Sequence, residues 1–371
     1  MKIVFIALFL ICLPLITVAQ NLVIDGGLED TLKCPQSIGR FYHWSNTNER
    51  YTTHWRSTTP ASPDYHNQCG YSSFQPNTGR GYAGLLYYDG SEVREYITAL
   101  LSDTLIAGEK YYLEYYVALN GNSTLAVDEV QVHFSAGVPL NTTFPPPYPY
   151  ALTPHLQAAS TPTSTSYQLI SGCYTASGGE DAITFGNFQN NANTNTTTVS
   201  GVGSVNSYYF LDDVRLVHVN ANASGNGSNL SADTISGASY QWINCEGNIP
   251  IAGAISDTYQ ANTSGDYAVI VTIGGCSDTS ACVNVDFSAL SELQKTSVSI
   301  FPNPTTEKLQ VSWSGKVNAI QLVDLSGRIV WEETTLAGQA HEIDLSRLAK
   351  GIYELQLFSG QSRITKKVVK N

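Results

Sequence analysis

Short runs in which apolar and polar residues alternate recur along most of the chain. Before residue 220 the clearest runs are 22–24, 97–101, 111–119, 127–135, 182–185 and 208–219. A period of two residues, bounded by Gly, Asn, Ser, Thr and Pro, is typical of strands with one buried face. Helical periodicity is absent from this region, so the pattern predicts an all-β chain that begins with a jelly-roll sandwich over residues 20–220.

Two breaks in this pattern divide the chain further. Residues 220–229 are rich in Asn, Gly and Ser and cannot bury enough apolar area to order themselves, and residues 289–297 form a short linker. Strand-like runs resume after each break. We therefore expect a small second sandwich over residues 221–288 and a small C-terminal β-sandwich of about seven short strands over residues 298–371.

The first residues predict a secretory signal peptide. Lys2 precedes an apolar run over residues 3–18, and small residues suited to cleavage lie at Thr17 and Ala19. The run is shorter than the roughly 20 residues that span a bilayer, and it contains Pro14. We expect residues 1–19 to be removed, which leaves a mature chain without a membrane span.

Composition narrows the class of function. The chain has 22 Tyr, 30 Gly, one Met and 13% charged residues, which suits strands and polar turns better than helices. Its formal net charge is −12, so it would repel phosphate backbones, and we expect no nucleic-acid partner. Six cysteines remain after Cys12 leaves with the signal peptide, and an even count in an exported chain favours disulfides.

Residues 21–29 and 209–216 carry a family resemblance. The first segment, Asn-Leu-Val-Ile-Asp-Gly-Gly-Leu-Glu, resembles the opening of carbohydrate-binding jelly rolls of the galactose-binding-like superfamily, although Asp25 and Leu28 depart from the family pattern. The second resembles their closing strand. The resemblance implies a jelly roll with a structural calcium ion, which is the one cofactor we expect, and its candidate ligands are Glu29, Asp212 and Asp213.

The acids allow a second interpretation, in which they only cap a strand edge. Neighbouring residues of a strand point to opposite faces, so we expect the pair Asp212–Asp213 to offer only one carboxylate to any single site. The same holds for the acid pair Asp128–Glu129.

Residues 232–287 resemble an Ig-like or PKD-like sandwich. The segment 239–242 resembles the strand that carries the core tryptophan, here Trp242, and 265–272 resembles the strand that opens with a corner tyrosine, here Tyr267. A hairpin at Gly274–Gly275 places Cys282 level with Tyr267, near Cys245. We therefore favour a Cys245–Cys282 disulfide and leave the pairing of Cys173 and Cys276 open.

Three motifs stand in order in the last module: Phe-Pro-Asn-Pro at 301–304, Asp-Leu-Ser-Gly-Arg at 324–328 and Leu-Ala-Lys-Gly-Ile-Tyr at 348–353, followed by a basic tail at 366–370. Together they resemble the sorting domain of the Bacteroidetes type IX secretion system. The resemblance implies recognition by the translocon and export across both membranes to the cell surface or the extracellular space. Its motif residues here are Pro302, Asn303, Pro304, Gly327, Gly351 and Tyr353.

Aromatic residues are concentrated between residues 41 and 74. Rings among Asn, His and Arg suit a glycan, because ring faces stack on sugar C–H surfaces while polar groups bond hydroxyls. The candidate ligand-binding residues are Trp44, Trp55, Tyr65 and Tyr42. The interpretation we favour is that these rings pack one end of the sandwich and that a Cys34–Cys69 disulfide pins the loop.

No catalytic signature is present, neither a nucleophile elbow, nor a zinc-binding helix motif, nor a phosphate-binding loop. We therefore expect a non-catalytic, exported binding protein for a glycan or a cell-surface partner. The alternative is a structural or adhesive protein of the outer surface that takes no small ligand.

Overall fold

The computed structural model describes residues 21–42, 44, 50–143, 149–287, 297–336, 338–359 and 362–371. The expected signal peptide and nearly all of the expected linker, 289–297, lie outside these residues. In the described part of the chain, no helix has the length and apolar character needed to cross a membrane.

Alternation along β5 (Lys110–Leu119) shows how the first module, residues 21–220, is built. Tyr111 and Leu113 point into the core and are buried, whereas Glu114 and Tyr116 on the opposite face are half-buried. A strand of this kind buries one face and leaves the other to neighbours or water. Its outward face therefore decides what the module can contact.

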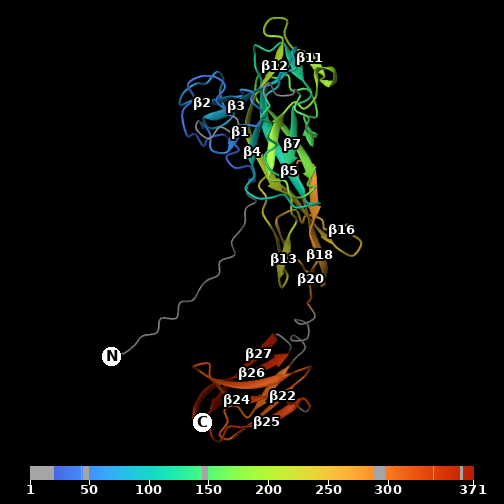
Figure 1. The fold of residues 1–371 in the computed structure, drawn as a ribbon. Coiled ribbons are helices and arrows are strands. Elements are labelled where there is room, and N and C mark those ends of the chain that lie inside the picture. Colours follow the sequence, from blue (N-terminus) through green and yellow to red (C-terminus); the bar gives the residue numbers. More distant parts are fainter. Residues whose placement is uncertain are drawn as a thin grey trace, which may run out of the picture.

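Two five-stranded antiparallel sheets face each other across one apolar core (Figure 1). One sheet has the order β1 (Trp55–Ser57), β4 (Ile97–Leu100), β10 (Ala182–Gly186), β7 (Gln131–Ser135) and β8 (Leu156–Gln157). The other, called the β3–β12–β5 sheet below, has the order β2 (Asp64–Asn67), β3 (Gly81–Asp89), β12 (Asn206–His218), β5 and β9 (Gln168–Thr175). A small pair, β6 (Leu125–Val127) with β11 (Thr196–Thr198), and a 3-10 turn at Asn191–Asn193 complete this jelly-roll sandwich.

The second module, residues 221–287, is an Ig-like pair of sheets. One has the order β13 (Ala223–Asn226), β14 (Asn229–Ala232) and β17 (Thr258–Gln260). The other has the order β16 (Ile249–Pro250), β15 (Ser239–Asn244), β18 (Gly265–Ile273) and β19 (Cys276–Thr279), with β20 (Val283–Val285) also on β18. Trp242 is fully buried between them, and the Tyr267 hydroxyl donates to the carbonyl of Thr263 at 2.9 Å.

The first two modules share an apolar junction. Tyr112, Val217 and Val219 of the first module belong to the same core cluster as Trp242. A disulfide joins Cys173 on β9 to Cys276 on β19 across this junction. The structure also joins Cys34 to Cys69 and Cys245 to Cys282, the two pairs considered from the sequence.

The C-terminal module, residues 297–371, is a smaller sandwich with its own core. A three-stranded sheet has the order β21 (Val298–Phe301), β22 (Lys308–Trp313) and β25 (Ala340–Asp344). A four-stranded sheet has the order β24 (Ile329–Glu333), β23 (Ala319–Asp324), β26 (Gly351–Ser359) and β27 (Ser362–Lys370). Leu309 and Val311 from the first sheet meet Leu322 and Leu355 from the second in one buried cluster.

Candidate binding face and sorting end

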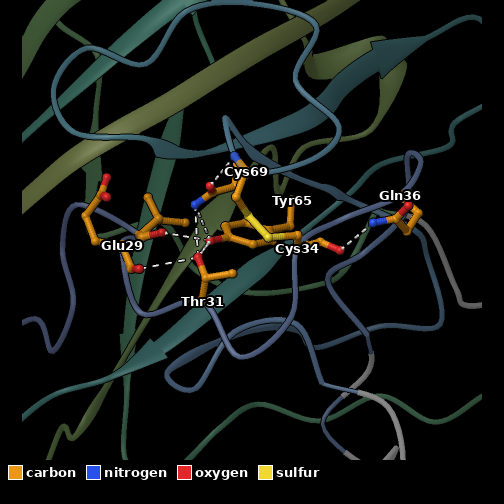
Figure 2. Close-up of a disulfide and its surroundings, with 8 residues drawn as sticks. Glu29, Thr31, Cys34, Gln36, Tyr65 and Cys69 are labelled. Atoms are coloured by element: carbon orange, nitrogen blue, oxygen red, sulfur yellow. Dashed lines mark hydrogen bonds between the residues drawn. A yellow bond between two sulfur atoms is a disulfide. The ribbon is translucent and has the colours of Figure 1, made fainter.

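Two of the four aromatic residues selected as a glycan surface lie in the core. Trp55 and Tyr65 have no exposed surface. The Trp55 indole N–H donates to the carbonyl of Asp25 at 2.8 Å, and the Tyr65 hydroxyl donates to that of Leu28 at 3.1 Å. Figure 2 shows Tyr65 inside the polar network beside the Cys34–Cys69 disulfide. The glycan prediction is wrong for these two rings, because a fully buried ring offers no face to a ligand.

Trp44 and Tyr42 are half-buried and contact cations of their own loop. The Arg56 guanidinium carbon lies 4.8 Å from the centroid of a Trp44 ring, and Arg40 donates to the Tyr42 hydroxyl at 2.7 Å. Each ring thus has a partner within the chain. A ligand role for these two residues stays a prediction.

The acid pair on β12 does not alternate as the sequence suggested. The register of β12 against β5 shifts between Asp212 and Arg215, and Asp213 has a left-handed backbone with φ 50°. Such a bulge turns consecutive side chains toward the same side. Asp212 accepts the backbone N–H of Asn77 at 2.7 Å, and Asp213 accepts the Asn77 side-chain amide at 2.7 Å. Burial, and then the charge of Asp213, raises the pKa of Asp212 to about 8.

The three candidate calcium ligands all bond to residues 77–81, and a calcium role for them stays a prediction. Glu29 accepts the backbone N–H groups of Arg80 and Gly81 at 2.7 and 2.9 Å, at the other end of the loop that holds Asp212 and Asp213. Among the described residues, no group of three or more His, Cys, Asp or Glu side chains is placed to hold a metal ion. N–H and O–H groups of residues 77–81 donate hydrogen bonds to these carboxylates.

The outward side of the β3–β12–β5 sheet has a hollow of about 370 Å³ near residue 74. Phe74 lies flat on Phe210, with ring centroids 4.6 Å apart and planes 5° from parallel. Polar groups surround these rings. The hollow is lined by Ser73, Phe74, Asn120, Gly121, Asn122, Thr165 and Phe210.

A second hollow of about 340 Å³ lies on the other side of residues 73–78. Tyr116 supplies a half-buried ring, and the Arg215 guanidinium donates to the Glu114 carboxylate at 2.8 Å. Arg215 also donates to the carbonyl of Ser236 in the second module at 2.8 Å. The remaining lining residues are Asn21, Gly27, Asn77, Thr78, Asp213 and Val214.

Of the residues that line these two hollows, sequence reasoning selected only Asp213, and selected it as a calcium ligand. The signal that could have found them is the outward set of β5, where Glu114 and Tyr116 alternate with core residues. A half-buried tyrosine beside a charged residue on a sheet face is a better ligand candidate than a ring in a long loop, because a sheet fixes its direction. We call the two hollows together the binding face.

The second module has a polar hollow of about 470 Å³ on its three-stranded sheet. Cross-strand pairing sets two rows of uncharged side chains there, namely Ser224, Ser231, Thr258 and Asn226, Asn229, Gln260. These side chains are exposed. Tyr259 packs toward Trp242 at a centroid distance of 5.9 Å, so it is less available for stacking than Tyr116.

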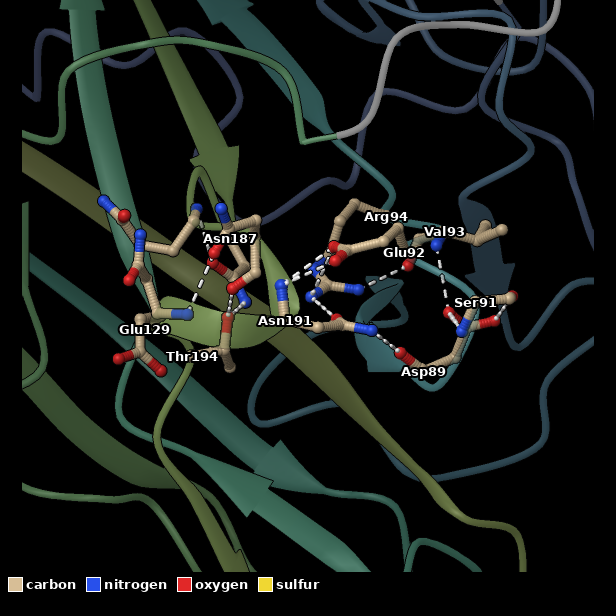
Figure 3. A network of polar contacts seen from close by, with 12 residues as sticks. Asp89, Ser91, Glu92, Val93, Arg94, Glu129, Asn187, Asn191 and Thr194 are labelled. Atoms are coloured by element: carbon tan, nitrogen blue, oxygen red, sulfur yellow. Dashed lines mark hydrogen bonds and ion pairs between the residues drawn. The ribbon is translucent and has the colours of Figure 1, made fainter.

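Glu129, from the acid pair Asp128–Glu129, has a structural role. Glu129 is buried and accepts the backbone N–H of Asn195 at 3.0 Å. Figure 3 shows it beside the network around buried Arg94, which donates to the side chain of Asn191 and to the carbonyl of Val93. Glu129 is therefore engaged in holding its loop.

Glu95 predicts a pH dependence of stability. Burial, and then the charge of Asp64, raises the pKa of Glu95 to about 8 from its usual value of 4.5. The stability that the folded state keeps by burying a protonated Glu95 is fully present below about pH 4.5. It is lost as the pH rises through 8. We expect Glu95→Gln to stabilise the first module at pH 9, by on the order of 2 kcal/mol, and to change little at pH 5. Calorimetry at the two pH values measures this.

Glu246→Gln is the matched control for that substitution, because Glu246 is exposed. The unfolding temperature of the Glu246→Gln protein should equal that of the intact protein at both pH values. A Glu95→Gln protein with the same pH dependence as the intact protein would contradict the prediction.

The three C-terminal motifs meet at one end of their sandwich. Asn303 donates to the carbonyl of Lys367 and accepts the N–H of Val369, both at 2.8 Å. On the adjoining ladder Asp324 lies opposite Tyr353, and Gly351 lies opposite Lys370. The Pro-Asn-Pro segment, the hairpin with Gly327 and the segment before Tyr353 thus lie toward the same end of the four-stranded sheet. We call this region the sorting end.

Comparison with known proteins identifies the C-terminal module. The family described as "Secretion system C-terminal sorting domain" matches residues 299–371. No curated protein matches the chain.

Solved structures with related architecture are distant. They include the CBM22-1 xylan-binding domain of Paenibacillus barcinonensis Xyn10C, at 14% identity over 51% of this chain and 99% of that one, with a TM-score of 0.28. The adhesin domain of Epf from Streptococcus pyogenes is 7% identical over 73% and 97% of the two chains, with a TM-score of 0.28. The four N-terminal Ig domains of Dscam1 isoform 6.9 are 11% identical over 84% and 91%, with a TM-score of 0.19. These scores carry no argument about a ligand.

Proposed function

Because residues 299–371 are a type IX sorting domain and the chain is exported to the cell surface or the extracellular space, we propose that residues 21–287 bind a neutral glycan there. One observation carries the proposal: the binding face combines an aromatic ring with hydrogen-bonding side chains in each of two adjoining hollows. Concave sites of this size, with a few placed polar groups, suit small ligands.

The chemistry of the two hollows matches a sugar chain. The rings of Phe74 and Tyr116 offer surface for sugar C–H groups, and Asn120, Asn122 and Thr78 offer partners for hydroxyls. Charge favours a neutral ligand. Arg215 is already paired with Glu114, and the chain as a whole has a net charge of −12, which disfavours sulfated or phosphorylated glycans.

The proposed role is binding without catalysis. Each carboxylate near the second hollow has a protein partner: Glu114 pairs with Arg215, and Asp213 accepts from Asn77 and Thr78. A general acid or base needs a group free to exchange a proton with the substrate. These pairings support an architecture that holds a ligand in place.

Tyr116→Ala is expected to weaken glycan binding about fivefold to tenfold, because a stacked ring contributes about 1 kcal/mol. A glycan array identifies the ligand and titration calorimetry measures Kd. Trp44→Ala is the matched aromatic control, since Trp44 lies outside both hollows, and it should leave Kd unchanged. Binding that survives Tyr116→Ala and is lost on Trp44→Ala would move the site to the 41–74 loop.

A structural or adhesive role is the competing function. It predicts no signal on a glycan array and a loss of cell aggregation when residues 21–287 are deleted from the exported chain. That pair of results would overturn glycan binding.

A further inference from the structure

Residues 70–80, called the crossing loop below, separate the two hollows of the binding face. Phe210 on β12 lines the first hollow, and Tyr116, which lies opposite Asp212 in the β5–β12 ladder, lines the second. Phe210 and Asp212 are two positions apart, which is about 7 Å along a strand. The crossing loop lies over this short interval, because it contacts both residues.

The crossing loop contacts the sheet through one stacked ring and a few hydrogen bonds. The Phe74 ring lies flat on Phe210, with centroids 4.6 Å apart. The Tyr82 hydroxyl accepts the N–H of Phe74 and donates to its carbonyl, both at 2.7 Å. Asp212 accepts the N–H of Asn77 at 2.7 Å. A sugar chain offers the same chemistry, because its C–H faces stack on rings and its hydroxyls donate and accept hydrogen bonds.

The loop is fixed at its two ends and lightly held in its middle. Cys69, just before the loop, is joined to Cys34, and Glu29 accepts two backbone N–H groups at the other end. Each of residues 72–78 is half-buried or exposed. A segment with few buried contacts opens at a lower free energy than the core around it. Residues 72–78 are therefore able to leave the sheet while the disulfide and the core stay in place.

Two polar side chains beside the crossing loop lack hydrogen bonds. His66 is 1% exposed, and neither of its ring nitrogens has a hydrogen-bond partner among the described residues. The same is true of the buried Tyr167 hydroxyl. The His66 ring stacks on Tyr82 at 4.7 Å between centroids, and the Tyr167 ring lies 5.8 Å from that of Phe74. A buried polar group without a partner costs stability, so these groups raise the free energy of the closed arrangement.

We propose that the two hollows are the ends of one groove, and that a neutral glycan chain long enough to fill both displaces residues 72–78 from the sheet. This inference rests on the proposed glycan binding and adds a control on which glycans the groove accepts. Phe210 then stacks on a sugar ring in place of Phe74, and Asp212 accepts a sugar hydroxyl in place of a backbone N–H. A glycan that fits one hollow leaves the loop where it is.

Hydrogen exchange of the full chain, followed by mass spectrometry, measures the state of the loop. The probes are neutral hexasaccharides of glucose, xylose, mannose and galactose, each compared with its disaccharide. We expect a hexasaccharide that binds to speed exchange in residues 72–78 about fivefold, because the N–H groups of Phe74 and Asn77 lose their acceptors. The matching disaccharide should not speed it. A ligand that binds beside a closed loop slows exchange or leaves it unchanged.

Two ring deletions should change the affinity for that hexasaccharide in opposite directions. Phe74→Ala should tighten binding about fivefold, because binding no longer has to break the stack on Phe210. Tyr116→Ala should weaken binding, as the proposed function requires. Gln75→Ala alters an exposed side chain of the same loop and is the matched control, which should change neither affinity nor exchange. Melting temperatures show whether the variants fold, and the exchange experiment on the intact chain needs no variant.

The outcomes separate this inference from the proposed function. Hexasaccharide binding with slowed or unchanged exchange in residues 72–78 would overturn the displaced loop and leave glycan binding in place. Weaker hexasaccharide binding by a folded Phe74→Ala protein would do the same. Binding by the Phe74→Ala protein alone would support a blocked groove. If neither the intact chain nor that variant binds a hexasaccharide, both proposals are wrong.

Discussion

A chain that ends at residue 287 is expected to fold and yet to be lost from the cell surface and the medium. All three disulfides, between Cys34 and Cys282, lie before that point, as do the cores of the first two modules. Among the residues that the structure describes, the core of the C-terminal module is formed by residues 298–368. Removing that module therefore takes away the sorting signal and leaves the other two cores intact. Fractionated cells probed with an antibody against the first module measure the loss.

The control for this truncation is a chain that keeps residues 297–371 and lacks residues 221–287. It should still leave the cell if the sorting domain acts alone. Equal export of the chain that ends at 287 and the intact chain would show that the signal lies elsewhere.

The alternating pattern predicted strands well where one face is buried along the whole run. The run 111–119 is β5, and the run 208–219 is β12, each shifted by a residue or two. The run 127–135 is split between β6 and β7, because Asp128 and Glu129 turn to hold the loops at Thr161 and Asn195. The segment 22–24 makes only a single bridge, from Val23 to Leu101.

Features that depend on residues far apart in the chain could not be predicted from the sequence. Trp55 looks like a loop residue, and its burial follows from the pairing of β1 with β4, more than 40 residues later. Asp212 and Asp213 look like alternating strand residues, and a register shift against β5 redirects them. The sorting motifs were readable because each is a short turn with its own residue requirements, whereas their convergence follows from the order of the strands.

The largest effect on stability is expected from the disulfide that sequence reasoning left open. Cys173 and Cys276 are 103 residues apart, and a cross-link that closes a loop of about 100 residues contributes about 4 to 5 kcal/mol in the chain-entropy model. We expect Cys173→Ala with Cys276→Ala to destabilise the first two modules by on the order of 4 kcal/mol. Chemical denaturation followed by tryptophan fluorescence and calorimetry measures this.

Cys34→Ala with Cys69→Ala is the matched control, because that bridge spans only 35 residues within the first module. It should cost less and leave the two modules coupled. Loss of the Cys173–Cys276 bridge should also separate their unfolding transitions, since the junction would then rest on Tyr112, Val217 and their apolar partners alone. A single unchanged transition in the Cys173–Cys276 double variant would contradict this.

The Cys173–Cys276 disulfide also affects the binding face. Arg215 is held between Glu114 of the first module and the carbonyl of Ser236 in the second, so the second module helps to fix one wall of the second hollow. A variant that loosens the junction lets Arg215 lose the second of these bonds. We therefore expect the same double variant to weaken glycan binding at temperatures where both modules stay folded, although neither cysteine lines a hollow. Titration of the variant against the glycan that binds the intact chain measures this, and an unchanged Kd would show that the first module holds the site without help from the second.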